Sequence, residues 1–156
     1  MNIYCSSALH QIQVAVHTTI EMMDKLKDDD LQKRPTPGKH SIRELLEHIS
    51  IICKADALIA DGASEESMSN FYAHISLKTL NEIKENLANN YQFLVSKYAQ
   101  FTDEELEQDI TSYWGVTYTR YEWLLEIVSH LYHHRGQLHA MLVHCCSLDP
   151  RVPLFE

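Results

Sequence analysis

Long apolar runs are absent from this 156-residue sequence. The longest apolar stretch, from Ile49 to Ala60, is interrupted by Lys54 and Asp56, and it falls short of the about 18 apolar residues that a membrane span needs. No basic segment followed by an apolar run and a small-residue cleavage site opens the chain, so no signal peptide is expected. We therefore expect a cytoplasmic protein that does not bind a membrane.

Positive charge is also scarce in the chain. Thirteen Lys and Arg residues face 22 Asp and Glu residues, which gives a formal net charge of -9. An acidic surface repels phosphate backbones and anionic lipids, which excludes nucleic acid and membrane surfaces as expected partners. The expected partner is a small-molecule substrate.

Cysteine, glycine and proline each occur only four times. The few glycines and prolines permit long helices. Cys5, Cys53, Cys145 and Cys146 form no CxxC pair, and no basic neighbour marks the adjacent Cys145 and Cys146 as activated thiolates. We expect four reduced thiols in a single domain, residues 1–156, which is long enough to fold without disulfides or a structural metal.

Four segments carry apolar residues at the three- and four-residue steps of an amphipathic helix. The expected helices cover residues 2–27, 41–60, 77–98 and 119–146. They predict an all-α fold, a four-helix bundle. Residues 62–75 are expected to form a loop, and a short extra helix or irregular segment is expected between the third and fourth long helices.

Helix boundaries are marked by capping residues. Ser41, Thr102 and Thr119 are each followed three residues later by Glu, the pattern of a capping box at a helix start. Asp61-Gly62 is typical of a helix end, because glycine adopts the left-handed conformation of the cap. These signals fix the second long helix best, since both of its ends are marked.

Ten histidines stand out in a chain of this length. A helical wheel, at about 100° per residue, puts His134 in the apolar stripe of the last helix and His130 at its edge. His48 lies at the edge of the stripe in the second helix. His10 and His17 project far from the stripe of the first helix, and His133, His139 and His144 are expected to face solvent. His40 precedes the second helix, and His74 lies in or beside a loop.

His48, His130 and His134 are therefore the candidate metal ligands. Neutral imidazole is the commonest metal ligand in proteins. Two histidines four residues apart and a third on a facing helix leave one coordination position open, as in catalytic metal sites. An inward histidine is also commonly a hydrogen-bonded core residue, and the spacing alone leaves both interpretations open.

Two motifs resemble those of the DinB-like family, which is also called YfiT-like. Residues 130–137 read HLYHHRGQ, similar to the family pattern HxxxHRGQ, and residues 41–49 read SIRELLEHI, similar to its serine-capped LL-x-H-I motif. The resemblance implies a four-helix bundle that is commonly a homodimer. It also implies one divalent ion, nickel or zinc, on His48, His130 and His134, and in some members a low-molecular-weight thiol cosubstrate.

Three functions are compatible with this resemblance. The first is a metal-dependent thiol S-transferase of the bacillithiol type, the second a metal-dependent hydrolase, and the third a non-enzymatic, stress-linked metal- or ligand-binding bundle. For a hydrolase, Asp56 is a candidate base, although it lies about 12 Å along the helix from His48, too far for a metal ligand.

Four other residues have predicted roles near these motifs. Arg135 lies outside the apolar stripe, which favours a structural ion pair over the alternative of orienting an anionic cosubstrate. Gln137 is expected to make an interhelical hydrogen bond. Trp114 and Tyr118 are expected to pack on the bundle, and the alternative is that they rim a pocket.

Overall fold

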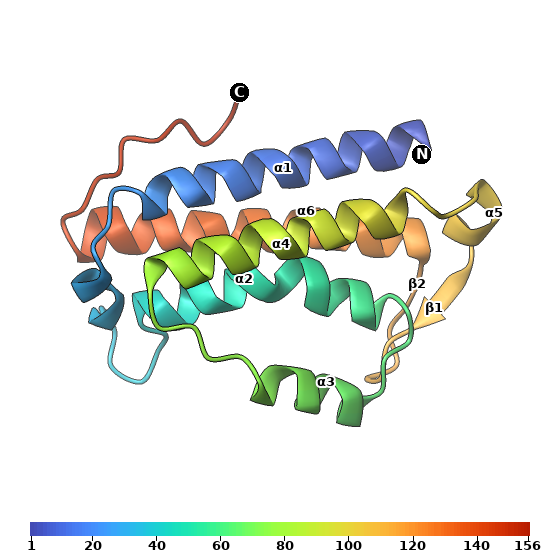
Figure 1. Cartoon of the computed structure of the whole chain (residues 1–156), viewed down its shortest axis with the longest axis horizontal. Coiled ribbons are helices and arrows are strands. Elements are labelled where there is room, and N and C mark those ends of the chain that lie inside the picture. Colours follow the sequence, from blue (N-terminus) through green and yellow to red (C-terminus); the bar gives the residue numbers. More distant parts are fainter.

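The computed structural model describes all 156 residues and contains four long helices. The four are α1 (Ile3–Met23), α2 (Ile42–Ile59), α4 (Leu80–Tyr98) and α6 (Arg120–Ala140). Shorter elements connect them: α3 (Glu65–Ala73), α5 (Asp103–Leu106), β1 (Asp109–Thr111) and β2 (Thr117–Thr119). Figure 1 shows the long helices side by side, which confirms the predicted four-helix bundle.

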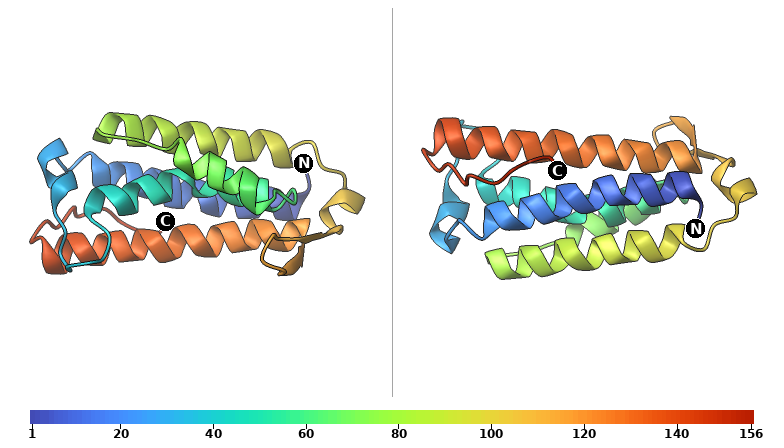
Figure 2. Two further views of the ribbon diagram at one scale, coloured as in Figure 1. Left: turned by 90° about the horizontal axis from the view of Figure 1, so that it is seen from below. Right: turned by 90° about the horizontal axis from the view of Figure 1, so that it is seen from above.

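The bundle has one long crossover connection. α1 packs against α4 and α6, and α2 packs against the same two helices, so α1 and α2 lie on opposite corners (Figures 1 and 2). α1 and α6 run in one direction, whereas α2 and α4 run in the other. The chain must therefore return along the bundle between α2 and α4, and α3 lies in this return, outside α2.

A single large apolar core lies between the four long helices. Apolar residues of α4 are buried there, among them Ile83, Leu87 and Leu94, each 0% exposed. A second, smaller cluster joins Met68 of α3 and Trp123 of α6 to the end of α2. None of the helices combines the length and apolarity needed to cross a membrane.

The capping signals of α2 are confirmed at both ends. Ser41 Oγ accepts from Glu44 N at 3.2 Å, and Glu44 Oε2 accepts from Ser41 N at 2.8 Å, which completes the capping box. Gly62 has φ of +80°, the left-handed conformation that favours glycine. α2 therefore holds His48 on a helix whose start and end are both fixed locally.

The prediction that the first helix reaches residue 27 is wrong, because α1 ends at Met23. The acidic residues 28–30 instead open a separate 3-10 helix, Asp28–Gln32, where negative charge favours the positive end of the helix dipole. Asp28 also accepts a hydrogen bond from Leu80 N at 2.9 Å, which ties this segment to the start of α4.

The predicted loop over residues 62–75 is also wrong, since it contains α3. Ser64 Oγ accepts from Ser67 N at 3.2 Å, which caps this helix. Met68 is the only buried residue of α3, so the apolar periodicity that indicates a helix is almost absent. The next helix starts at Leu80 rather than residue 77, because Thr79 and Glu82 form a capping box.

The irregular segment before α6 is a short antiparallel hairpin of β1 and β2. Gly115, with φ of +94°, supplies the left-handed residue of its turn. Trp123 of α6 donates from Nε1 to Ile110 O at 3.0 Å, and its ring lies edge-on to Trp114 and Tyr118. Tyr118 thus packs on the bundle as predicted, whereas Trp114 remains 51% exposed.

We expect acid to weaken the start of α2 through Glu44. Its hydrogen bonds from Arg34 and Ser41 lower the pKa of Glu44 from 4.5 to about 2. A carboxyl with a lowered folded-state pKa stabilises the fold above pH 4.5 and loses that contribution as pH falls through about 2. The difference in unfolding free energy between wild type and Glu44→Gln should shrink over this range in denaturant titrations. Glu104→Gln, at an exposed position, should show no such trend.

Candidate metal centre

Three histidines from two antiparallel helices meet at one point between α2 and α6. His48 comes from α2, and His130 and His134 come from successive turns of α6. His48 Nε2 lies 3.2 Å from His130 Nε2 and 3.1 Å from His134 Nε2. The structure thus brings together the three residues that the sequence selects, and each is only partly buried.

The outer nitrogens of two of these rings have acceptors. His130 Nδ1 lies 2.7 Å from Asp56 Oδ2, and His134 Nδ1 lies 2.9 Å from Gln137 Oε1. An acceptor at Nδ1 places the ring hydrogen there, which leaves the Nε2 lone pair of a neutral imidazole free. Both rings therefore direct a lone pair toward His48 Nε2.

This arrangement has the donor set and spacing for a divalent cation. With lone pairs on His130 Nε2 and His134 Nε2, the single ring hydrogen of a neutral His48 can satisfy only one of the two contacts. The edge of a tetrahedral site with metal–nitrogen bonds of about 2.0–2.1 Å is about 3.3 Å. The observed separations of 3.1 and 3.2 Å are close to this edge.

The pKa shifts differ among the three imidazoles. Burial and the neighbouring His134 and His130 lower the pKa of His48 to about 4. Burial likewise lowers the pKa of His134, although the bond to Gln137 opposes it. Burial also acts to lower the pKa of His130, but the hydrogen bond and charge of Asp56 outweigh it and the net shift is upward. His48 and His134 are thus held in the neutral form that binds metal.

Asp56 and Glu126 form a carboxyl pair beside His130. One side-chain oxygen of each and a ring nitrogen of His130 all lie within 4.8 Å of one another. Burial and the charge of Asp56 raise the pKa of Glu126. Asp56 contacts the outer nitrogen of His130 and has no contact with His48, in line with the prediction that it lies too far from His48 to be a metal ligand. Sequence reasoning missed its role as the partner of His130, and it missed Glu126 entirely.

A cleft of about 810 Å³ opens at His48 and runs along the start of α2. We call it the α2 cleft, and its walls come from the segment before α2, from α2 itself, and from the end of α3 with the residues that follow it. The residues that line it are Arg34, Gly38, Lys39, His40, Glu44, Glu47, His48, Ile51, Tyr72 and Ile75. The cleft gives a small molecule a route to one of the three histidines.

The prediction that Arg135 lies outside the core is wrong, because its side chain is only 2% exposed. It points away from the histidines, and Nη1 donates to Thr18 Oγ1 of α1 at 2.9 Å. The guanidinium stacks over the rings of Tyr132 and Phe155, with no carboxylate partner. Its role is structural, but it is a buried cation stabilised by aromatic rings rather than an ion pair.

Gln137 bonds within its own helix, to His134, and not between helices as predicted. An acceptor three residues after His134 lies over the same turn of α6, so the sequence spacing alone was compatible with this contact. Gln137 therefore orients a candidate ligand.

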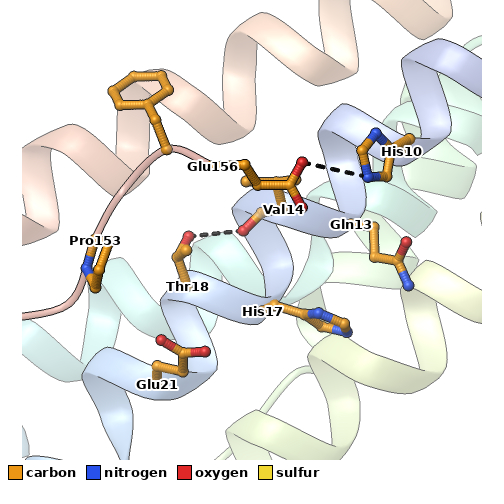
Figure 3. Close-up of a pocket in the computed structure, with 9 residues that line it drawn as sticks. His10, Gln13, Val14, His17, Thr18, Glu21, Pro153 and Glu156 are labelled. Atoms are coloured by element: carbon orange, nitrogen blue, oxygen red, sulfur yellow. Dashed lines mark hydrogen bonds and ion pairs between the residues drawn. The ribbon is translucent and has the colours of Figure 1, made fainter.

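A second cavity, of about 440 Å³, lies between α1 and the C-terminal segment and contains none of the three histidines (Figure 3). His10 and His17 line it from α1, and His10 Nε2 lies 3.6 Å from Glu156 Oε2. Both histidines are exposed, as the helical wheel predicts. This cavity is separate from the candidate metal centre.

The four cysteines are free thiols in the structure. Cys5 and Cys53 are buried, and burial raises the pKa of Cys53 to about 12. Burial also raises the pKa of Cys146, more than the nearby Lys33 lowers it. Neither Cys53 nor Cys146 has the lowered pKa of a reactive thiolate.

Comparisons with known proteins connect the fold to one superfamily. A family model described as the DinB superfamily matches residues 11–138. A crystal structure from Exiguobacterium sibiricum 255-15, assigned to the DinB family, is 33% identical, covers 99% of both chains and has a TM-score of 0.84. No protein among the curated proteins matches the sequence.

More distant structures share the fold alone. A DinB-like protein from Bacillus cereus ATCC 10987 is 19% identical over 95% of each chain, with a TM-score of 0.74. A mycothiol-dependent maleylpyruvate isomerase is 11% identical, with a TM-score of 0.66. That match covers 88% of this chain and 63% of the isomerase chain.

Proposed function

This chain belongs to the DinB superfamily, and we propose that it binds one divalent ion, zinc or nickel, through His48, His130 and His134 and acts as a thiol S-transferase. A small molecule would be its substrate, and a low-molecular-weight thiol its cosubstrate. The homodimer expected from the family resemblance remains a prediction, which sedimentation of the purified protein would test.

The observation that carries the proposal is the convergence of three Nε2 atoms, with two of their lone pairs set by Asp56 and Gln137. In a histidine that serves only as a core residue, the ring N–H normally donates to an acceptor and the other ring nitrogen accepts from a donor. Lone pairs of two rings aimed at a third ring nitrogen favour a cation among them. Three protein ligands would leave a fourth position for a substrate atom.

Thiol chemistry suits a site of this kind. A bound divalent cation supplies positive charge that lowers the pKa of a thiol and favours the thiolate, which is the nucleophile. The chain contributes the α2 cleft, where the phenol of Tyr72 is a neutral hydrogen-bond donor. The mycothiol-dependent isomerase with the same fold supports a thiol over other cosubstrates.

A metal-dependent hydrolase is the second candidate, and the Asp56–Glu126 pair favours it. A carboxyl with a raised pKa, as at Glu126, is typical of residues that take up or release protons near neutral pH. Ester or amide hydrolysis by the metal-loaded protein that is lost in Glu126→Gln, without loss of metal, would support this candidate over the transferase.

Cobalt(II) spectroscopy tests the proposed thiol function. Wild-type protein loaded with cobalt should develop a sulfur-to-cobalt charge-transfer band when a small thiol such as 2-mercaptoethanol is added, because the open position accepts the sulfur. His134→Ala should lose both cobalt and the band. A cobalt-loaded wild type whose visible spectrum is unchanged by thiols would contradict the transferase and leave metal binding as the function.

A further inference from the structure

His40 lies directly before the N-cap Ser41 of α2. Its side chain is 63% exposed. It nevertheless lines the same cleft as His48. Because Ser41 is held in a capping box, the backbone that carries His40 is anchored where α2 begins.

The carboxylate of Glu44 lies near the His40 ring and is held in place by hydrogen bonds. His40 Nδ1 is 3.9 Å from Glu44 Oε2. Both oxygens of Glu44 accept from Arg34, each at 2.9 Å, and Oε2 also accepts from Ser41 N. At this separation, which is longer than a hydrogen bond, Glu44 can stabilise a positive charge on the ring, and Nε2 stays open to a proton donor in the cleft.

The other polar groups of the α2 cleft are poor proton acceptors. Arg34 and Lys39 are cations. Glu44 is engaged by Arg34, and Glu47 Oε1 accepts from Leu77 N at 2.8 Å. The phenol of Tyr72 keeps its proton, since burial and Asp56 raise its pKa to about 12. Among the groups that line the cleft and lie outside the three-histidine set, His40 is the one with a free acceptor nitrogen.

We propose that His40 is the general base that takes the proton of the thiol cosubstrate in the α2 cleft. The S–H bond breaks, the proton passes to His40 Nε2, and sulfur keeps the electron pair. The thiolate is then available to the three-histidine site, and the imidazolium that forms is stabilised by the adjacent Glu44. This assignment rests on the proposed thiol function and adds a residue that acts on the cosubstrate.

Stopped-flow mixing of cobalt-loaded protein with 2-mercaptoethanol tests the role of His40. The variant His40→Gln removes the acceptor nitrogen, and His74→Gln, an exposed histidine outside the cleft, is the matched control. We expect His40→Gln to bind as much cobalt as wild type but to develop the sulfur-to-cobalt band about 100-fold more slowly at neutral pH. The two rates should converge above about pH 9, where the free thiol ionises without help.

The outcomes separate the two proposals. A band that forms equally fast in wild type and His40→Gln at every pH would overturn the role of His40 and leave the thiol function standing. Loss of cobalt from His40→Gln would also overturn it, since His40 would then be a ligand. A wild type that binds cobalt but shows no band with the thiol would overturn the thiol function and, with it, this role.

Discussion

Replacement of Asp56 by Asn is expected to weaken divalent-metal binding by about 10–100-fold, the usual effect of removing a residue that orients a metal-binding histidine. The carboxylate of Asp56 lies 2.7 Å from His130 Nδ1 and is 8% exposed as a residue. An Asn side chain can still accept the hydrogen bond, but the negative charge that makes the imidazole a stronger donor to a cation is lost. Asp56→Ala removes both the hydrogen-bond acceptor and the negative charge, and it should weaken metal binding further.

Competition with a chromogenic chelator measures this change in zinc or nickel affinity. Asp24→Asn is the matched control, because Asp24 lies at the end of α1 and forms a surface ion pair with Lys84 of α4. It should leave the affinity within about twofold of wild type, given the small contribution of exposed ion pairs. Equal affinities in Asp56→Asn, Asp56→Ala and wild type would show that Asp56 does not act through His130.

Leu124→Ala should lower the unfolding free energy by about 2–5 kcal/mol, the range for large-to-small changes in a packed core. Leu124 is 0% exposed and belongs to the main core cluster. Truncation removes apolar contacts and leaves a cavity between α6 and its neighbours, because helices held at both ends relax only in part. The change is far enough from His130 along α6 that the candidate metal centre should persist in the folded variant.

The adjacent leucine provides the control. Leu125 is 42% exposed, so Leu125→Ala should change the unfolding free energy by no more than about 0.5 kcal/mol. Urea titrations of both variants, in protein treated with chelator to exclude metal effects, measure the difference. Similar losses for the two leucines would contradict the packing of α6 described here.

Local sequence signals were sufficient for the long helices. The capping box at Ser41 and the glycine at residue 62 bound α2 in the structure as they do in the sequence. Apolar residues of α4 recur at helical steps and are buried accordingly. Where the fold depends on such short-range physics, periodicity and capping are enough to predict it.

The elements that the sequence did not predict, α3 and the short helix after α1, make contacts with distant parts of the chain. α3 buries only Met68, which packs against a cluster that includes Trp123 from a distant part of the chain. Asp28, in the 3-10 helix that follows α1, accepts a hydrogen bond from Leu80 N, 52 residues away. No pattern within either segment encodes these contacts.

The three candidate ligands could be predicted from the sequence, whereas the residues that surround and orient them could not. The spacing of the histidines and the helix faces on which they lie select His48, His130 and His134 from the ten histidines of the chain. Asp56 lies too far along α2 from His48 to be a ligand beside it, yet it contacts Nδ1 of His130 across the helix interface. The helical wheel puts Arg135 outside the apolar stripe, but the rings of Tyr132 in α6 and of Phe155 in the C-terminal segment cover its guanidinium.

Metal analysis of protein purified without an affinity tag tests the central claim most directly. Wild type should carry about one divalent ion per chain, as expected for a site with three histidine ligands. The triple variant His48→Ala, His130→Ala, His134→Ala should carry none while its circular dichroism remains helical. A second triple variant, His10→Ala, His17→Ala, His74→Ala, should keep the ion. Wild-type protein that binds no divalent metal even after incubation with zinc or nickel, or a His48/His130/His134 variant that retains it, would contradict the account.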